Sequence, residues 1–320
     1  MVLAAAGVAL LIAAGIVAAF KFGGSGGQTP GPGVAATGPG AAATGTGSSS
    51  APPAATAATA APTPSPRASG PAASHSDPLG SAAAGYVSTR AGVVMAAVYD
   101  LRTGQTWQLG RGQPQDEASV VKLDVLETLL AERGHTGTEL SASDRSLAEQ
   151  MIEDSDNDAA TSLWDEVGGA SGIRAFNTSA GLADTVPSPC VQCAGFPWPG
   201  WGLSTTVPGD QLTLLRRLVE PNSLLSSSER TYALSLMENV TADQRWGVSG
   251  GVPAQVTVAL KNGWLPLNSA NTDWQINSEG WISGGGRDYL IAVLSTGNPT
   301  EQYGIDTIDQ LAAMVWNAMA

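Results

Sequence analysis

Ser119 and Lys122 stand three residues apart at the head of a strongly apolar segment that continues to Leu130. Positions i and i+3 share one face of a helix, so the hydroxyl and the amine can meet there. An apolar helix is a buried helix, and burial disfavours a charged amine and lowers its pKa. A lysine with a lowered pKa can serve as a general base at neutral pH. The spacing therefore indicates a serine nucleophile that is activated without histidine.

Lysine is otherwise rare in this chain. From residue 80 onward there are two lysines, Lys122 and Lys261, against eleven arginines. Arginine cannot lose its proton in a protein, whereas lysine can, and lysine also acts as a compact point charge. Both lysines are therefore candidates for chemistry that arginine cannot do, and the simpler alternative for each is an ordinary surface position.

Two further short motifs follow Lys122 in the chain. Ser155-Asp156-Asn157 lies in a region with helical patterning, and Lys261-Asn262-Gly263 ends a predicted strand and precedes Trp264. Each motif alone is weak, because Ser, Asp and Asn gather in turns and helix caps for purely local reasons.

Together, in this order, Ser-x-x-Lys, Ser-Asp-Asn and Lys-x-Gly form a specific pattern. It resembles that of the class A β-lactamases and penicillin-binding proteins, and the resemblance extends over residues 80–320. Two other stretches look like class A in particular: residues 155–160, which lead into Gly168-Gly169-Ala170, and residues 204–210, which lead into Leu214-Leu215.

The resemblance implies a role for each motif residue. Ser119 would be the acylated nucleophile, Lys122 its base or proton relay, and Ser155 the donor of a proton to the departing nitrogen. Asn157 would hold the substrate amide, and Lys261 would supply positive potential for a substrate carboxylate. The resemblance also implies substrate contacts from the end of the third motif: Asn262, Gly263 and Trp264. The backbone N–H groups of Ser119 and Trp264 would form the oxyanion hole.

The chain departs from the class A pattern in three ways. Residues 185–209, which correspond to the omega loop, contain no carboxylate, whereas class A enzymes use a glutamate there to activate the deacylating water. Because a general base contributes about 10²–10⁴-fold, deacylation is expected to be slow. Asn262 replaces the usual Thr or Ser, and the segment between Ser119 and Ser155 is shorter than is typical of class A. Trp198, Trp201 and Trp264 either line the cleft or pack in the interior.

The order of predicted elements indicates an α+β fold of the β-lactamase/transpeptidase type. Strands are expected at residues 93–100, 105–109, 256–261, 274–281 and 288–296, with helices between about residues 141 and 238 and an amphipathic helix at the C-terminus. Strands at both ends predict one antiparallel sheet built from the two termini, flanked by helices, with an inserted all-helical lobe.

The sequence predicts three zones. Residues 1–20 are an apolar run long enough to span a bilayer, and an uncleaved anchor and a cleaved signal both stay open. Residues 21–79 are nearly all Gly, Ala, Pro, Ser and Thr, which predicts a disordered tether. Residues 80–320 are the expected hydrolase domain, whose excess of acidic residues argues against nucleic-acid partners. The protein is expected to be extracytoplasmic, either membrane-anchored or secreted, and to contact the membrane through its N-terminal segment only.

Cys190 and Cys193 are the only cysteines, and with an export segment upstream they are expected to form a small-loop disulfide. A redox motif is the alternative, but the surrounding prolines and glycines do not supply its usual context. With two histidines far apart, a zinc site is not expected, and no cofactor is expected either.

Three functions are compatible with these observations. The first is an exported serine hydrolase that is acylated at Ser119 by β-lactams or related amides, as a monomer. The second is a peptidase or penicillin-binding protein that acts on the stem peptides of peptidoglycan. The third is a wall-binding module that kept the fold and lost turnover. The five motif residues together argue against the third, whereas Asn262 and the altered omega loop argue for it.

Overall fold

The computed structural model describes residues 76–110 and 112–320. The chain divides into two units, Met1–Ser65 and Pro66–Ala320, and only the second contains described residues. The predicted membrane segment 1–20 and nearly all of the predicted tether 21–79 lie outside the described residues. The three-zone organisation therefore stays a prediction.

A five-stranded antiparallel sheet is assembled from both ends of the described chain, as predicted. Its strands are β1 (Val93–Asp100), β2 (Thr106–Leu109), β5 (Thr257–Pro266), β6 (Trp274–Gly284) and β7 (Arg287–Asn298). They follow the order β2-β1-β7-β6-β5, so the first and last strands of the chain pair in the middle of the sheet. A second small sheet pairs β3 (Gln115–Asp116) with β4 (Thr205–Thr206).

One prediction about strand β5 was wrong. Lys261-Asn262-Gly263 was expected to end a strand, but β5 pairs with β6 from Thr257 as far as Pro266. The apolar and aromatic side chains of Trp264 and Leu265 continue the strand past the polar motif. Lys261 therefore stands in the middle of a strand, where its backbone is held on one side by β6.

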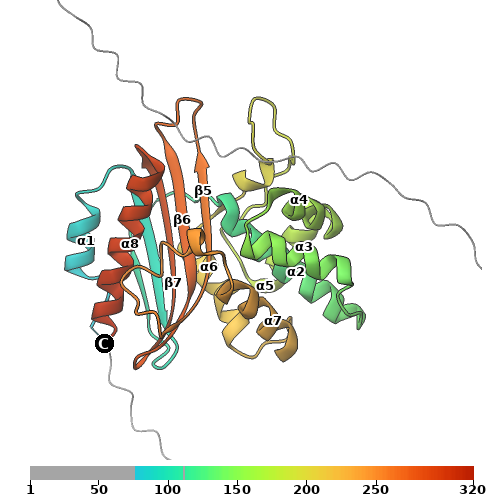
Figure 1. Ribbon diagram of the computed structural model, residues 1–320, viewed down its shortest axis with the longest axis horizontal. Coiled ribbons are helices and arrows are strands. Elements are labelled where there is room, and N and C mark those ends of the chain that lie inside the picture. Colours follow the sequence, from blue (N-terminus) through green and yellow to red (C-terminus); the bar gives the residue numbers. More distant parts are fainter. Residues whose placement is uncertain (1–75, 111) are drawn as a thin grey trace, which may run out of the picture. The chain divides into compact units, whose positions relative to one another are not determined.

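Two helices cover one face of the sheet (Figure 1). They are α1 (Ser81–Val87) and the C-terminal α8 (Glu301–Ala318). Ile308, Leu311 and Val315 recur on one side of α8 and join a buried cluster with sheet residues such as Ile291 and Val258. This is the apolar face that the periodicity of the C-terminal sequence predicted.

The other face of the sheet meets the helical lobe, which lies on the opposite side in Figure 1. Its helices are α2 (Val121–Thr136), α3 (Ala142–Glu153), α4 (Asn157–Glu166), α5 (Gly169–Ala180), α6 (Pro208–Val219) and α7 (Ser227–Glu238). Helix α6 contacts strands β1, β6 and β7 and joins the lobe to the sheet. Short 3-10 turns stand at η1 (Ala118–Val120), η2 (Gly200–Leu203) and η3 (Ala242–Gln244).

Local sequence signals fix where these helices begin and end. Ser141 and Ser226 form capping boxes with Asp144 and Glu229, so the first turns of α3 and α7 have partners for their backbone N–H groups. Helix α2 ends at Gly137, whose φ of 66° is the left-handed conformation that glycine adopts readily. Within the part of the chain that the structure describes, none of the helices combines the length and apolarity needed to cross a bilayer.

Candidate active site

Ser119, the predicted nucleophile, lies in η1 directly before α2, and we call this segment the nucleophile turn. Ala118 precedes Ser119 with φ of 49°, a left-handed conformation that costs a non-glycine residue about 1–3 kcal/mol. The surrounding structure holds this turn from two sides. The Glu117 N–H donates to Ser204 O at 2.7 Å, and Asn277 Nδ2 donates to Glu117 O at 2.9 Å. A strained backbone held in this way is typical of functional sites.

Lys122 is fully buried, and its amine makes three contacts. Nζ donates to Ser155 O at 2.6 Å, to Ser155 Oγ at 3.0 Å and to Asn157 Oδ1 at 2.9 Å. Burial, together with the nearby charge of Lys261, lowers the pKa of Lys122 well below its usual value. The structure thus gives Lys122 the environment of a general base.

The Ser-Asp-Asn motif joins α3 to α4, and each residue has a distinct local task. Ser155 has φ of 55°, again a left-handed non-glycine position. Asp156 caps α4, because its Oδ1 accepts from the Ala159 N–H at 2.7 Å. Asn157 begins the helix and accepts from Lys122. The cap and the turn together fix Ser155 and Asn157 against the lysine.

Lys261 reaches the same serine from the sheet side. Its Nζ donates to Ser155 Oγ at 3.0 Å and to Asn262 O at 3.0 Å, and the residue has no exposed surface. Burial lowers the pKa of Lys261 to about 7, while the Glu279 carboxylate acts in the opposite direction. The three motifs that the sequence predicted therefore converge on one hydroxyl.

Gly263 lies against the nucleophile turn. A Cβ at this position would stand 2.8 Å from Glu117 O, 2.8 Å from Ser119 N and 2.9 Å from Val120 N. These are closer than carbon approaches backbone atoms, so the close packing of β5 on η1 requires glycine. The third residue of Lys-x-Gly thus brings the strand into contact with the backbone of Ser119.

Asn262 and Trp264, the other predicted substrate contacts, make hydrogen bonds and ring contacts with the segment before β5. Asn262 is buried, and its Nδ2 donates to Gln244 O at 2.6 Å and to Trp246 O at 3.1 Å, so the amide nitrogen ties β5 to the segment before it. Trp264 is half-buried and meets Trp246 edge-on, with ring centroids 6.0 Å apart. Substrate contact by either residue stays a prediction.

The segment that corresponds to the omega loop contains the disulfide. Cys190 and Cys193 are bonded, which confirms the prediction. Trp201 is buried, and its Nε1 donates to Thr161 Oγ1 at 3.1 Å, which anchors the segment to α4, while its ring centroid lies 5.1 Å from Lys122 Nζ. Trp198, by contrast, is 46% exposed.

Sequence reasoning missed a set of carboxyl groups buried behind the site. Glu117, Asp124, Glu127 and Glu279 are at most 1% exposed, and burial raises the pKa of each. Asp124 and Glu127 stand inside the segment that was read only as apolar. An acidic residue within an apolar helix was the signal that could have revealed them, because such residues are seldom buried without a partner.

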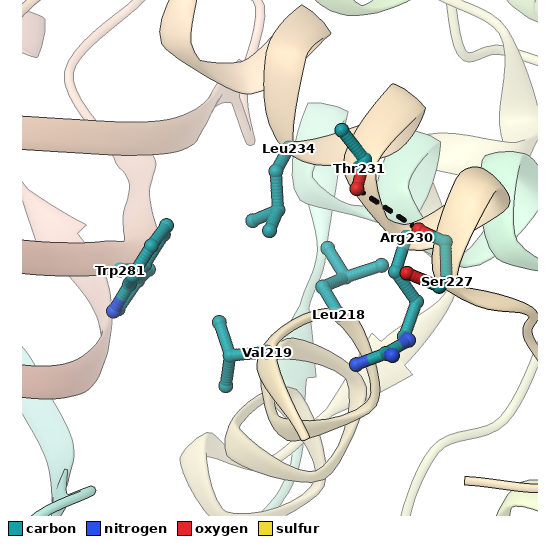
Figure 2. A pocket seen from close by; sticks show the side chains of 7 residues that line it. All are labelled: Leu218, Val219, Ser227, Arg230, Thr231, Leu234 and Trp281. Carbon is teal, nitrogen blue, oxygen red and sulfur yellow. Dashed lines mark hydrogen bonds between the residues drawn. The ribbon is translucent and has the colours of Figure 1, made fainter. Parts of the chain in front are cut away.

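Two cavities lie in the helical lobe, away from the three motifs. Figure 2 shows the first, of about 210 Å³, between α6, α7 and the side chain of Trp281 on β6. Its lining is Leu218, Val219, Ser227, Arg230, Thr231, Leu234 and Trp281. The second, of about 570 Å³, lies between the end of α2, α5 and the loop before α7. Neither is lined by a residue of the nucleophile turn, the Ser-Asp-Asn loop or the Lys-Asn-Gly strand.

This fold and this arrangement of motifs define a protein of the superfamily that contains the β-lactamases and penicillin-binding proteins. A family model described as "Beta-lactamase enzyme family" matches residues 130–319, and the chain belongs to that family. The matched range includes Ser155, Asn157 and Lys261 and begins after Ser119 and Lys122.

Curated relatives cover part of the chain. Proteins named "Putative lipoprotein LppW" from Mycobacterium tuberculosis and Mycobacterium bovis are 27% identical to it over 205 residues. The alignment spans 62% of this chain and 62% of the length of those relatives.

Solved structures confirm the fold class. The TLA-1 extended-spectrum β-lactamase has a TM-score of 0.64 at 17% identity, with 73% of this chain and 95% of that chain covered. A class A β-lactamase from Bacteroides cellulosilyticus gives 0.63 at 17% identity, with 73% and 94% covered. PBP-A gives 0.60 at 21% identity, with 72% and 92% covered. At these identities the likeness establishes the α+β fold that the sequence predicted.

Proposed function

We propose that this protein is an exported serine hydrolase that is acylated at Ser119 by β-lactams or related amides and releases the acyl group slowly. The observation that carries the proposal is the convergence of two buried amines, Lys122 and Lys261, on Ser155 Oγ at 3.0 Å each. The nucleophile stands one helical turn before the first of these amines. Such a cluster can receive, hold and return a proton.

In the proposed acylation, Ser119 Oγ attacks the amide carbonyl carbon while its proton passes to the neutral amine of Lys122. The negative charge that develops on the carbonyl oxygen is held by the backbone N–H groups of Ser119 and Trp264. When the carbon–nitrogen bond breaks, Ser155 donates its proton to the departing nitrogen, and Lys122 returns a proton to Ser155. The net change is one ester formed, one amide cleaved and one proton moved from Ser119 to the leaving group.

Slow release follows from the composition of residues 185–209. With no carboxylate in that segment, the deacylating water lacks the base that class A enzymes use, and the loss of a general base costs about 10²–10⁴-fold. With nitrocefin we expect a burst of about one equivalent per protein, followed by near-silence. Sustained fast turnover would show that another group acts as the deacylation base.

The same missing carboxylate favours a second candidate. A peptidase that acts on stem peptides of peptidoglycan needs acylation but not the omega-loop base of a β-lactamase, and the fold is similar to that of PBP-A. The two functions are separated by incubating the protein with a model stem peptide that ends in D-Ala-D-Ala. Catalytic release of D-alanine would support the peptidase, and its absence alongside labelling by penicillin would support the first function.

Export is proposed from the N-terminal sequence. The apolar run at residues 1–20 and the tether at residues 21–79 would place the domain 80–320 outside the cytoplasmic membrane as a monomer, and the mycobacterial relatives are named as lipoproteins. Fractionation of cells expressing the full chain tests this directly. Recovery of the domain in the membrane or medium supports export, whereas recovery in the cytosol contradicts it.

Labelling by a fluorescent penicillin tests the central step. The full chain should retain fluorescence through denaturing electrophoresis, and Ser119→Ala should abolish it. Gly85→Ala is a matched control, because a Cβ at Gly85 meets nothing within 4 Å and the position is on α1, remote from the site. Labelling that survives Ser119→Ala would contradict the assignment of the nucleophile.

A further inference from the structure

Lys261 has a buried acidic partner on the neighbouring strand. β5 and β6 pair Lys261 with Glu279, so both side chains project from the same face of the sheet. Lys261 is 0% exposed and Glu279 is 1% exposed. A buried amine keeps its positive charge only if an opposite charge or several acceptors compensate for the lost water. In this pair, the charge of each group shifts the pKa of the other toward its charged form.

Glu279 combines a charged neighbour, Lys261, with a polar partner, Gln211 on α6. With the Gln211 amide oriented to satisfy both of its neighbours, Nε2 donates to Glu279 Oε2 at 2.6 Å, and the amide oxygen accepts from Thr206 Oγ1 at 3.0 Å. A donor aimed at a carboxyl oxygen favours the ionised form. Burial raises the pKa of Glu279 well above its usual value, and the Lys261 charge and the Gln211 donor act against that rise and favour the carboxylate.

The remaining groups around the cluster do not compete for this role. The carboxyl oxygens of Glu117 and Glu127 have no hydrogen-bond partner among the described residues, and Asn177 is the polar neighbour of Asp124. Burial is the largest influence on the pKa of each of these three acids and raises it, which favours their neutral forms. The titratable groups that act on the buried acids and on the two lysines come from β3, the nucleophile turn, α2, α6 and the cap of α4: Asp116, Glu117, Asp124, Glu127, Asp210, Arg217 and Asp156. Asp156 raises the pKa of Lys122, against the larger effects of burial and the Lys261 charge. Arg217 lowers the pKa of Glu127, and no such effect of Glu127 on Lys261 is present.

Two charged amines are poorly tolerated on one hydroxyl. Lys122 and Lys261 both lie 3.0 Å from Ser155 Oγ, so a charge on one disfavours a charge on the other. A neutral Lys122 can still donate to Ser155 O and Asn157 Oδ1 while its lone pair accepts the Ser155 hydroxyl proton. A charged Lys261 keeps donors for Ser155 Oγ and Asn262 O. With Lys261 charged and Lys122 neutral, each of these hydrogen bonds has one donor and one acceptor.

We propose that Glu279 is a positioning residue for the acylation proposed at Ser119: its carboxylate holds the positive charge on Lys261, and that charge in turn keeps Lys122 neutral and able to accept a proton. Glu279 acts through Lys261 and touches neither the nucleophile nor the substrate. In the resting protein, the proposal requires Glu279 to be negatively charged, Lys261 to be positively charged and Lys122 to be neutral.

The scarcity of lysine makes the charges directly measurable. The whole chain has three lysines, Lys21, Lys122 and Lys261, so carbon-13 labelling at lysine Cε gives three resonances, which single Lys→Arg variants assign. In the full wild-type chain, Lys261 should titrate near pH 7. The proposal requires Lys122 to lose its charge at a lower pH than Lys261 does. Lys122 titrating above Lys261 would overturn the proposal.

Glu279→Gln then tests the coupling. Removing the opposite charge of the paired residue on β6 should lower the Lys261 titration midpoint by about one to three pH units and raise that of Lys122. Glu279→Asp, which keeps the carboxylate, should restore most of the wild-type titration. Glu127→Gln is the matched control, because it removes an equally buried acid that faces Arg217, and it should leave Lys261 nearly unchanged. Equal shifts in the two Gln variants, or none in Glu279→Gln, would refute the proposal.

The pH dependence of the acylation rate is a second test of the coupling between Glu279 and Lys261. In Glu279→Gln the alkaline limb of the labelling rate should move to lower pH, with about tenfold slower acylation at pH 8, whereas Glu127→Gln should follow the wild type. Failure of the proposed function is a separate result. If the wild type is never acylated but the lysine titrations respond as described, acylation at Ser119 is wrong and the coupling of Glu279 to Lys261 stands. If the wild type is acylated and the titrations do not respond, the coupling is wrong.

Discussion

Adding one methyl group at Gly263 should damage both the stability and the chemistry of this protein. In Gly263→Ala the new Cβ would stand 2.8 Å from Glu117 O and from Ser119 N, and 2.9 Å from Val120 N. All three are backbone atoms, and the segment they belong to is held by Asn277 and Ser204, so no flexible side chain can yield. Strand β5 and the nucleophile turn must therefore move apart by several tenths of an ångström.

The magnitude follows from the packing. Forcing an extra methyl group into a close-packed interior costs about 1–3 kcal/mol of unfolding free energy. For a domain of this size that corresponds to a fall of about 2–4 °C in melting temperature per kcal/mol. The displaced Ser119 N–H is also a proposed oxyanion donor, and misplacing such a donor costs about 10²–10³-fold in rate. The acylation rate should therefore fall far more than the loss of stability alone would explain.

Thermal unfolding and the rate of labelling by a fluorescent penicillin check the two effects separately. Gly85→Ala is the matched control: it makes the same change on α1 with open space around the Cβ, and alanine in a helix should be neutral or stabilising by up to about 1 kcal/mol. If Gly263→Ala unfolds and labels as the wild type does, the close approach of β5 to the nucleophile turn is wrong.

Three further substitutions have expected outcomes. Burial raises the pKa of Asp124 from 3.8 to about 7, so the folded state keeps a proton that the unfolded chain loses, and stability from this group falls as pH rises through that window. Asp124→Asn should remove about 4 kcal/mol of this pH dependence, measured by urea unfolding at pH 4 and pH 8; an unchanged slope would contradict the burial of an uncompensated acid. Trp201→Ala should lower the free energy of unfolding by about 3–5 kcal/mol and Trp201→Phe by much less, because the indole is buried and anchors its segment. A Trp201→Ala variant with the melting temperature of the wild type would refute that role. Replacing Cys190 and Cys193 by Ser should cost about 2 kcal/mol or less, because the bond closes a very short loop, and a loss above 4 kcal/mol by denaturant unfolding would show a larger structural role.

The fold was predictable because its signals are local and periodic. The short runs that form the strands at both ends, the apolar face of α8 and the serine caps of α3 and α7 each depend on a few neighbouring residues in the sequence. Lys261 was misplaced at a strand end, since the polar motif interrupts the pattern while Trp264 and Leu265 continue the pairing with β6. The end of such a strand depends on how far the neighbouring strand pairs with it, and the spacing of residues in the sequence does not reveal that pairing.

The candidate site was predictable in part. The three motifs named the candidate site residues, and in the structure the amines of Lys122 and Lys261 both contact Ser155 Oγ. The left-handed backbone at Ala118 and Ser155 could not be foreseen, because neither residue type favours it and the surrounding contacts impose it. The role proposed for Glu279 could not be predicted from the sequence for a related reason, because it depends on the pairing of β6 with β5.

The central claim is a stable acyl-enzyme at Ser119, and the most direct measurement is the intact mass of the full chain over time after mixing with benzylpenicillin. The account predicts that one adduct equal to the whole drug forms on each protein, persists after excess drug is removed, maps to the peptide containing Ser119 and is absent from Ser119→Ala. An unmodified mass at every time, with the drug intact in solution, would contradict it.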